Sequence, residues 1–245
     1  LSYLIHKMVF TFSPKKQVAH GSLYAKIKNS FYILSLKEWN LDFFLYRFLW
    51  NPLKWAGKKL EFLTSNVSII LLCISYLAGL YCYYFRQNIS VPIIVFLPYV
   101  FSLVGLMLIV KAFTERGDAL RAWLLIIASQ LFTLISVALL NEKFGSREIL
   151  IYLSGLVVSA IVGFFCLKKV KEIDSNIDLN RFHGYVYEQP ALGFLFLISC
   201  LGLVGLPFTP TFIGIDLLFN HIYKYEVIVL IFTTLSFAII EISVL

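Results

Sequence analysis

Three ionisable residues lie within or beside long apolar runs, where a charge is expensive and therefore points to function. Asp216 follows a proline-containing interruption, and His221 ends the same segment. Glu241 lies deep in the last apolar run, and helical spacing predicts that it shares a face with Thr233 and Thr234. Asp216, Glu241 and His221 are therefore candidates for a proton or ion path. The alternatives are a helix cap or interfacial carboxylate for Asp216 and an interfacial position for His221.

The interruption before Asp216 combines the two residue types that a continuous helix tolerates least. Gly205, Pro207, Pro210 and Gly214 fall within about ten residues of an otherwise apolar stretch. In lipid, a broken helix persists only where protein or a water-filled cavity satisfies the freed backbone groups. The pattern predicts a helix break of the kind that transport proteins use.

The composition places these residues in a membrane protein. Of the 245 residues, 60% are hydrophobic and 14% are charged, and mean hydropathy is +0.84. A soluble domain carries about 25% charged residues. The four cysteines lie in apolar runs without CxxC spacing, which argues against a disulfide framework or a zinc site. No signal segment precedes the first predicted span, and the sequence ends inside an apolar run. We therefore expect a fragment of a longer polypeptide.

Windows of about 20 apolar residues, the length that crosses a bilayer, predict an all-α polytopic transmembrane bundle with six crossings. The fifth is too long for one straight crossing. It either kinks at Pro207 and Pro210 or divides into a crossing and a partly re-entrant half-helix, and the sequence leaves both open. The predicted spans are 67–85, 91–110, 122–140, 149–167, 191–221 with the break, and 226–245.

Lys and Arg are distributed unequally between the two sides of these spans. Residues 1–66 carry ten, the loop 111–121 three and the loop 168–190 four, whereas the intervening loops carry Arg86, Lys143 and Arg147. Lys224 is left out of this count, because its side depends on whether the broken span crosses fully. The positive-inside rule predicts that the region 1–66 and the loops 111–121 and 168–190 are cytoplasmic, or on the equivalent side in an organelle. The net charge of +7 reflects this bias and requires no nucleic-acid partner. Asp118 and Arg121 are predicted to form an ion pair where a helix begins, and Glu115 and Arg116 to be solvated loop charges.

The first 66 residues form a separate region that lacks a clean apolar run. From Leu41 to Leu63 apolar residues recur at helical spacing, with basic residues off that stripe and Trp50 and Trp55 suited to the membrane interface. We expect an interfacial amphipathic helix. It either lies on the membrane as a linker or docks along neighbouring subunits.

Part of this region resembles a known family. The segment Trp39-Asn-Leu-Asp42 to Pro52, with an Asp and a Pro ten residues apart, is similar to the region before the last span of the largest antiporter-like subunit of respiratory complex I. The resemblance implies three parts: a surface or linker segment at 1–66, a terminal-type helix at 67–90, and a partial second antiporter-like unit at 91–245. It also implies that a complete unit precedes Leu1.

A second resemblance covers roughly residues 100–220. The series Asp178-Leu-Asn-Arg-Phe-His-Gly184, Gln189-Pro190 and Gly205-Leu-Pro207-Phe-Thr-Pro210-Thr-Phe-Ile-Gly214 is similar to the core shared by three kinds of subunit. These are complex I antiporter-like subunits, multisubunit sodium/proton antiporters and the membrane subunit of inorganic-carbon uptake complexes. A weaker match runs from Lys111 to Arg121 and on to Ser129-Gln130-Leu131.

Several residues that the family uses to move protons are absent. The span 149–167 holds no Lys, His or carboxylate, and the Lys that often follows the break is Ile215 here. The resemblance therefore implies a degenerate second unit.

Three functions remain open at this stage. The first is a proton-translocating, antiporter-like subunit of a multisubunit complex of the NADH:quinone oxidoreductase type, in the bacterial inner membrane. The second is a structural or coupling subunit, including one for inorganic-carbon uptake, and the third is an unrelated polytopic transporter. The expected partners are other membrane subunits, the bilayer, and protons or Na⁺. No catalytic or cofactor site is visible, so any electron transfer belongs to partners.

Overall fold

The structure is a computed structural model that describes residues 29, 31–35, 41–141, 143–174, 177–180, 184–222 and 226–244. Trp39, Arg181, His183 and Lys224 lie outside the described residues, as does the side chain of Asp42. The chain divides into two compact units, residues 1–51 and 52–245.

The first unit confirms that the region from Leu41 onward is helical. Residues 31–35 are helical, and α3 (Leu41–Leu45) passes into the π-helix η2 (Tyr46–Trp50). The rings of Phe44 and Phe48, one turn apart, lie with centroids 4.6 Å from each other. Both rings are exposed, so the apolar stripe is available to lipid or to a partner.

Next along the chain are α4 (Asn51–Lys59) and the 3₁₀ segment η3 (Leu60–Thr64). Pro52 is the second residue of α4 and has no N–H to donate to the preceding turn of the helix. The ammonium of Lys59 lies 3.9 Å from the centre of the Trp55 ring, one turn away. This pairing of a basic group with Trp is typical of a helix at a membrane interface.

The second unit is a bundle of apolar helices, and the described residues contain no strand. Among the described residues, five helices are long and apolar enough to cross a membrane, and the shorter apolar helix Pro190–Val204 forms the first half of the broken span. The sequence predicted these elements within a few residues. They are α5 (Asn66–Tyr84), α6 (Val91–Thr114), α7 (Ala119–Leu140), α8 (Ser146–Ile173), α10 (Pro190–Val204), α11 (Pro210–Asn220) and α12 (Val227–Val244), with the short η4 (Arg86–Asn88) and α9 (Tyr185–Glu188) between them.

Two predicted boundaries were wrong, both because charged residues continue a helix. α6 runs through Lys111 to Thr114, and α8 runs through Lys168, Lys169 and Lys171 to Ile173. Lysines in a last turn stabilise the negative end of the helix dipole and can extend their stems along the helix surface. The helices therefore extend beyond the purely apolar windows.

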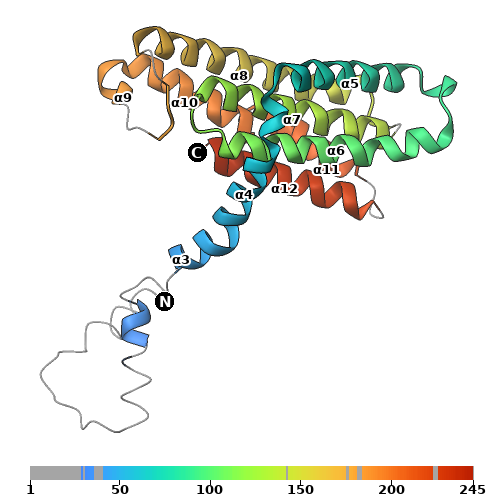
Figure 1. Cartoon of the computed structure of the whole chain (residues 1–245). Coiled ribbons are helices and arrows are strands. Elements are labelled where there is room, and N and C mark those ends of the chain that lie inside the picture. The colour runs from blue at the N-terminus through green and yellow to red at the C-terminus, as the bar shows by residue number, and fades with distance from the viewer. Residues whose placement is uncertain are drawn as a thin grey trace, which may run out of the picture. The chain divides into compact units, whose positions relative to one another are not determined.

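α7 lies in the middle of the bundle and is the most buried of the span-length helices. It packs against α6, where the Ser129 hydroxyl donates to the carbonyl of Gly105 at 2.7 Å, and against α5, where Tyr76 and Phe132 meet edge to face. On its other side the Trp123 indole donates to the carbonyl of Ala160 on α8 at 3.1 Å. Figure 1 shows these helices running side by side, with α8 and α5 on one side of α7 and α12 on the other.

The loops 111–121 and 168–190, which the sequence predicts on the same side of the membrane, are joined by hydrogen bonds. The N–H of Ala119 donates to the carbonyl of Ile177 and that of Leu179 to the carbonyl of Arg116, which joins the α6–α7 loop to the segment after α8. We call this the basic end of the bundle. At the opposite end, the Arg86 guanidinium donates to the carbonyl of Leu139, near the last residue of α7.

The broken span crosses the bundle fully. It starts at Pro190, after the basic end, and it finishes at His221, whose carbonyl accepts a 2.9 Å hydrogen bond from Asn141 at the opposite end. The His221 ring also lies against Phe144, which precedes α8. Of the two arrangements left open by the sequence, the structure therefore has the complete crossing. The following helix α12 starts at this same end, where the Tyr99 hydroxyl of α6 donates to Glu226.

Candidate functional site

The break between α10 and α11 is built by a glycine and two prolines. Gly205 has φ +86°, a left-handed conformation that glycine adopts without a Cβ penalty, and its N–H donates to the carbonyl of Leu201. Pro207 follows in the connection. Pro210 is the first residue of α11, where a missing N–H has no consequence. The sequence therefore stops one half-helix and starts the next within five residues.

A side chain from α7 satisfies a backbone group at the end of α10. The amide nitrogen of Gln130 donates to the carbonyl of Leu203 at 2.9 Å, and Gln130 is fully buried. Carbonyls in the last turn of a helix have no intrahelical partner, and water is scarce at membrane depth. This hydrogen bond stabilises the broken helix in the centre of the bundle.

α8 approaches the break closely because small residues lie at the contact. A Cβ at Gly155 would lie 2.3 Å from the Thr211 hydroxyl, and a Cβ at Gly214 would lie 2.6 Å from the Cα of Tyr152. One turn further along α8, Ser159 contacts Gly202 of α10 in the same way. A methyl group added to Gly155 or to Gly214 would therefore force α8 and α11 apart.

The interior around the break is polar and carries no charged group among the residues that the structure describes. The buried polar side chains come from five helices. They are Ser102, Ser129, Gln130, Thr133, Ser136, Ser199, Thr211, Thr233 and Ser236, with Asn141 at the opposite end and Lys111 at the basic end. Most bond to a nearby backbone carbonyl, as Ser136 does to that of Pro98 at 2.6 Å.

The ionisable residues singled out by the sequence lie outside this interior. Asp216 is on the exposed side of α11, where its carboxylate accepts a 3.2 Å hydrogen bond from Asn220. His221 is half-buried, with Nδ1 2.7 Å from the carbonyl of Leu217. Asp216, Asn220 and His221 thus gather at the last turns of α11, near the opposite end of the bundle.

Glu241 lies on the exposed side of α12, and the shared face predicted for it with two threonines was wrong in part. Thr234 is exposed like Glu241, whereas Thr233 is fully buried. Thr233 and Thr234 are adjacent, so their side chains point about 100° apart around the helix axis. The boundary between the buried and the exposed side of α12 lies between these two residues. Glu241 therefore lies on the outer surface of the described bundle.

The charges at the basic end pair differently from the expectation. The Asp118 carboxylate accepts the backbone N–H groups of Leu120 and Arg121 as the N-cap of α7, and its other oxygen lies 3.6 Å from Lys171. The Arg121 guanidinium lies 3.8 Å from Glu115 instead. The predicted helix-start role of Asp118 is present, and the predicted side-chain pair Asp118–Arg121 is replaced by these two contacts.

Lys111 and Glu115 form a salt bridge that the sequence reading missed. Lys111 Nζ lies 2.7 Å from a Glu115 oxygen, and their side chains are 8% and 12% exposed. Glu115 is therefore not a solvated loop charge, because α6 extends far enough to bury it. The spacing of four residues between Lys111 and Glu115, at the end of an apolar run, is the sequence signal for this salt bridge.

No group of three or more His, Cys, Asp and Glu side chains that could hold a metal ion occurs in the described part of the chain. The interior offers hydrogen bonding through neutral side chains, and carboxylates and an imidazole lie near the surface. Both suit proton transport.

One family model matches residues 67–240, which is most of the chain: the transmembrane domain of the NADH:quinone oxidoreductase/Mrp antiporter family. The match includes α5 together with the helices up to α12. No curated protein and no solved structure matches the chain. On this match, with the polytopic helical fold and the broken span, the chain belongs to the NADH:quinone oxidoreductase/Mrp antiporter membrane-domain family.

Proposed function

We propose that this chain is part of a proton-translocating subunit of a multisubunit complex, in which residues 91–245 form a degenerate second antiporter-like unit. Residues 1–66 and 67–90 would be the surface segment and last helix of a preceding unit. The family indicates a proton-translocating antiporter-like membrane domain, and an integral membrane protein with membrane partners. The tandem arrangement, the identity of the complex and a bacterial inner-membrane location belong to the proposal.

The observation that carries the proposal is the uncharged interior of the broken span. Gln130, Tyr152 and Thr211 are fully buried around the break, and the buried charge among the described residues is Lys111, at the basic end. A unit that moves ions by charged side chains would bury them at this depth. This unit would therefore pass protons through neutral groups, while charged relays act in the preceding unit.

The cargo proposed for this unit is the proton rather than Na⁺. The C-terminus of α10 and the N-terminus of α11 meet at the break, and their partial charges have opposite signs, so the helix ends alone do not hold a Na⁺ ion. A buried carboxylate that would hold one does not occur among the described residues. Asp216 and His221 are proposed to exchange protons with water at the opposite end, and Glu241 to do so at the outer side of α12.

A structural or coupling role is the second candidate, including one in an inorganic-carbon uptake complex. It is favoured by the exposed carboxylates Asp216 and Glu241 in membrane helices, which a neighbouring subunit with basic side chains would stabilise. Under this alternative the preceding unit alone conducts.

Proton uptake by vesicles carrying the intact complex separates the two candidates. The variants are Asp216→Asn and Glu241→Gln, with Glu188→Gln as a control because Glu188 is an exposed carboxylate in the short helix α9. Proton conduction through this unit predicts a lower flux in Asp216→Asn while the complex stays assembled. Unchanged flux in both variants would overturn it, and loss of assembly with unchanged flux per assembled complex would favour the coupling role.

A further inference from the structure

The connection between α10 and α11 lies at mid-depth in the bundle. Its level is fixed by Gln130, whose amide nitrogen donates to the carbonyl of Leu203 near the end of α10. Gln130 is eleven residues after the start of α7 at Ala119 and ten residues before its end at Leu140. At a rise of 1.5 Å per residue, the connection is about 15 Å from each end of a membrane-spanning helix, which is the middle of the hydrocarbon layer.

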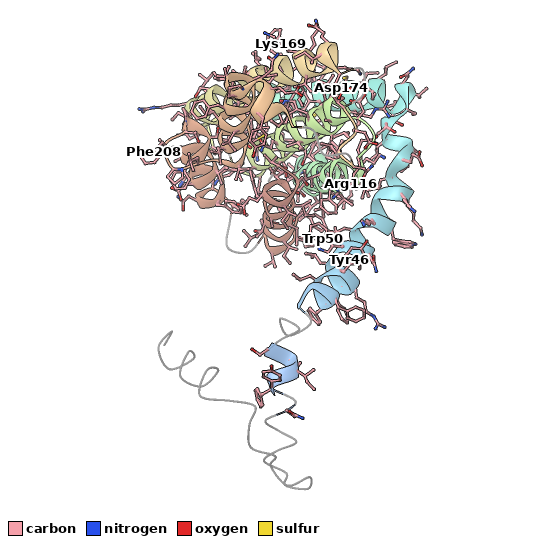
Figure 2. All side chains as sticks on the ribbon, turned by 90° about the vertical axis from the view of Figure 1, so that its left-hand side faces the viewer. Tyr46, Trp50, Arg116, Lys169, Asp174 and Phe208 are labelled. Atoms are coloured by element: carbon pink, nitrogen blue, oxygen red, sulfur yellow. The ribbon has the colours of Figure 1, made fainter. Side chains whose placement is uncertain are left out.

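This connection is on the outer surface of the bundle. Leu206, Pro207 and Phe208 are all exposed, and Phe208 is 94% exposed. Figure 2 shows Phe208 at the outer edge of the second unit. The segment is a turn closed by the N–H of Thr209, which donates to the carbonyl of Leu206 at 2.8 Å. Inside this turn, the N–H of Phe208 donates to no group in the described part of the chain.

Lipid cannot satisfy the backbone of this segment. Hydrocarbon offers no hydrogen-bond partner, so irregular backbone at this depth persists only where protein covers it or where it lines a water-filled cavity. A turn on the outer surface lines no cavity within the bundle. The exposed helices α5 and α8 differ in this respect, because their backbone groups are bonded within each helix. The connection therefore needs a protein cover that the regular apolar surfaces do not need.

An acidic residue continues the same surface along α11. Phe212, Asp216 and Asn220 are all exposed and are spaced four residues apart, so they form one stripe along the half-helix. Asp216 is about 9 Å along the axis from the start of α11, within the ~15 Å half-thickness of the hydrocarbon layer. Its carboxylate accepts a 3.2 Å hydrogen bond from Asn220. A carboxylate at this depth is costly unless a basic side chain also pairs with it.

We propose that a membrane-spanning helix of a neighbouring subunit packs on this surface and brings a Lys or Arg level with Asp216. The surface, which we call the break face, consists of Leu206, Pro207, Phe208, Phe212 and Asp216. Hydroxyl or amide side chains of the same helix would pair with the open peptide groups of the turn. The Phe208 ring would fill a pocket on that helix, since aromatic residues commonly anchor protein interfaces.

Charge complementarity favours this occupant over the other two. Lipid tails bring neither a positive charge nor a hydrogen-bond donor to the level of Asp216. In the described spans of this chain, Lys and Arg lie near the helix ends, so a second copy brings none to this depth. A different membrane subunit with a basic residue inside one of its spans meets both requirements.

Photocrosslinking in the intact complex tests the cover directly. Photoreactive benzoylphenylalanine at position 208 should form an adduct with another membrane subunit, whereas the same probe at position 165 should label lipid. Phe165 is the matched control, because it is 62% exposed on α8, where the backbone is regular. Labelling of lipid alone at position 208 would overturn the proposal, as would an adduct between two copies of this chain.

Charge reversal tests the basic partner. Asp216→Lys places two positive charges together, so the amount of intact complex that co-purifies with this chain should fall at least about tenfold. Asp216→Asn keeps the shape and a hydrogen-bonding side chain and should retain most of the assembly. Glu188→Lys is the control, since Glu188 is exposed in the short helix α9, outside the break face. Equal recovery of Asp216→Lys and the control would overturn the proposal, and the crosslinking result does not depend on whether Asp216→Lys folds.

The inference rests on the part of the proposed function that places this chain in a multisubunit complex, and not on proton conduction. An adduct from position 208 to another subunit, with wild-type proton flux in Asp216→Asn, upholds the interface and overturns conduction through Asp216. Lipid labelling at position 208 with a lowered flux in Asp216→Asn overturns the interface and leaves the proposed function standing.

Discussion

The amide nitrogen of Gln130 lies 2.9 Å from the carbonyl oxygen of Leu203, two residues before α10 ends in a left-handed glycine. The two residues are separated by 73 positions in the sequence and belong to different helices. This hydrogen bond joins the central helix of the bundle to the point where the backbone of the broken span is interrupted.

Replacing Gln130 by Leu should destabilise the second unit by about 1–3 kcal/mol, because the Leu203 carbonyl loses its partner in a buried position. Thermal unfolding of the purified complex measures this change. Ser154→Ala is the control, since Ser154 is exposed and bonds within its own helix to Ile151. A Gln130→Leu midpoint equal to that of the control would show that water, not Gln130, satisfies the carbonyl.

Gly214→Ala should be harmful because the new methyl group would meet the Tyr152 backbone at 2.6 Å. Over-packing of this kind costs about 1–3 kcal/mol and would separate α8 from α11. Gly184→Ala is the matched control, because nothing lies within 4 Å of a Cβ at that position. The yield of folded complex should fall for the first variant and not for the second. Equal yields would mean that α8 and α11 pack less closely than the structure has them.

Lys111→Met should destabilise the basic end more than the double change Lys111→Met with Glu115→Gln. The single change leaves a largely buried carboxylate with the Arg121 guanidinium 3.8 Å away as its remaining partner. Breaking a buried pair costs about 3–5 kcal/mol, whereas replacing both members is often close to neutral. Denaturation of the two variants by heat gives the order. If the double variant is the less stable one, the pair itself stabilises the fold.

The loop after α8 should be accessible only from the cytoplasmic side. In a background with Cys73 and Cys82 changed to Ser, Asn180→Cys should react with a membrane-impermeant maleimide in inside-out vesicles. Lys143→Cys, at the opposite end of the bundle, should react in right-side-out vesicles. Both residues are exposed, so access depends on sidedness alone. The reverse pattern would invert the orientation that the Lys and Arg distribution predicts.

The fold could be predicted closely from sequence because its main signals are local. Apolar windows located every span, Asp118 marked the start of α7, and Gly205 with Pro210 marked the break. What could not be predicted was which side of each helix is buried. α12 is apolar nearly all round, so its periodicity does not separate Thr233 from Thr234, whereas its packing against α6, α7 and α10 does.

The polar interior was missed for a related reason. Gln130, Tyr152 and Thr211 are neutral, and a single polar residue in an apolar run carries no periodic signal. Their significance depends on contacts between α7, α8, α10 and α11 that bring distant residues together. The charged candidates Asp216 and Glu241 were easier to see in the sequence, yet they lie on the outside of this unit.

The central claim is that this chain takes part in proton translocation by a larger membrane complex. The most direct measurement is proton uptake into vesicles containing the intact complex, compared with vesicles containing the same complex assembled without this chain. If the chain takes part, an uncoupler abolishes the uptake, and omitting the chain lowers the uptake at least about tenfold. A tenfold decrease corresponds to a barrier that is higher by roughly 1.4 kcal/mol. Equal uptake by both assemblies would contradict it and would leave the chain outside the proton path.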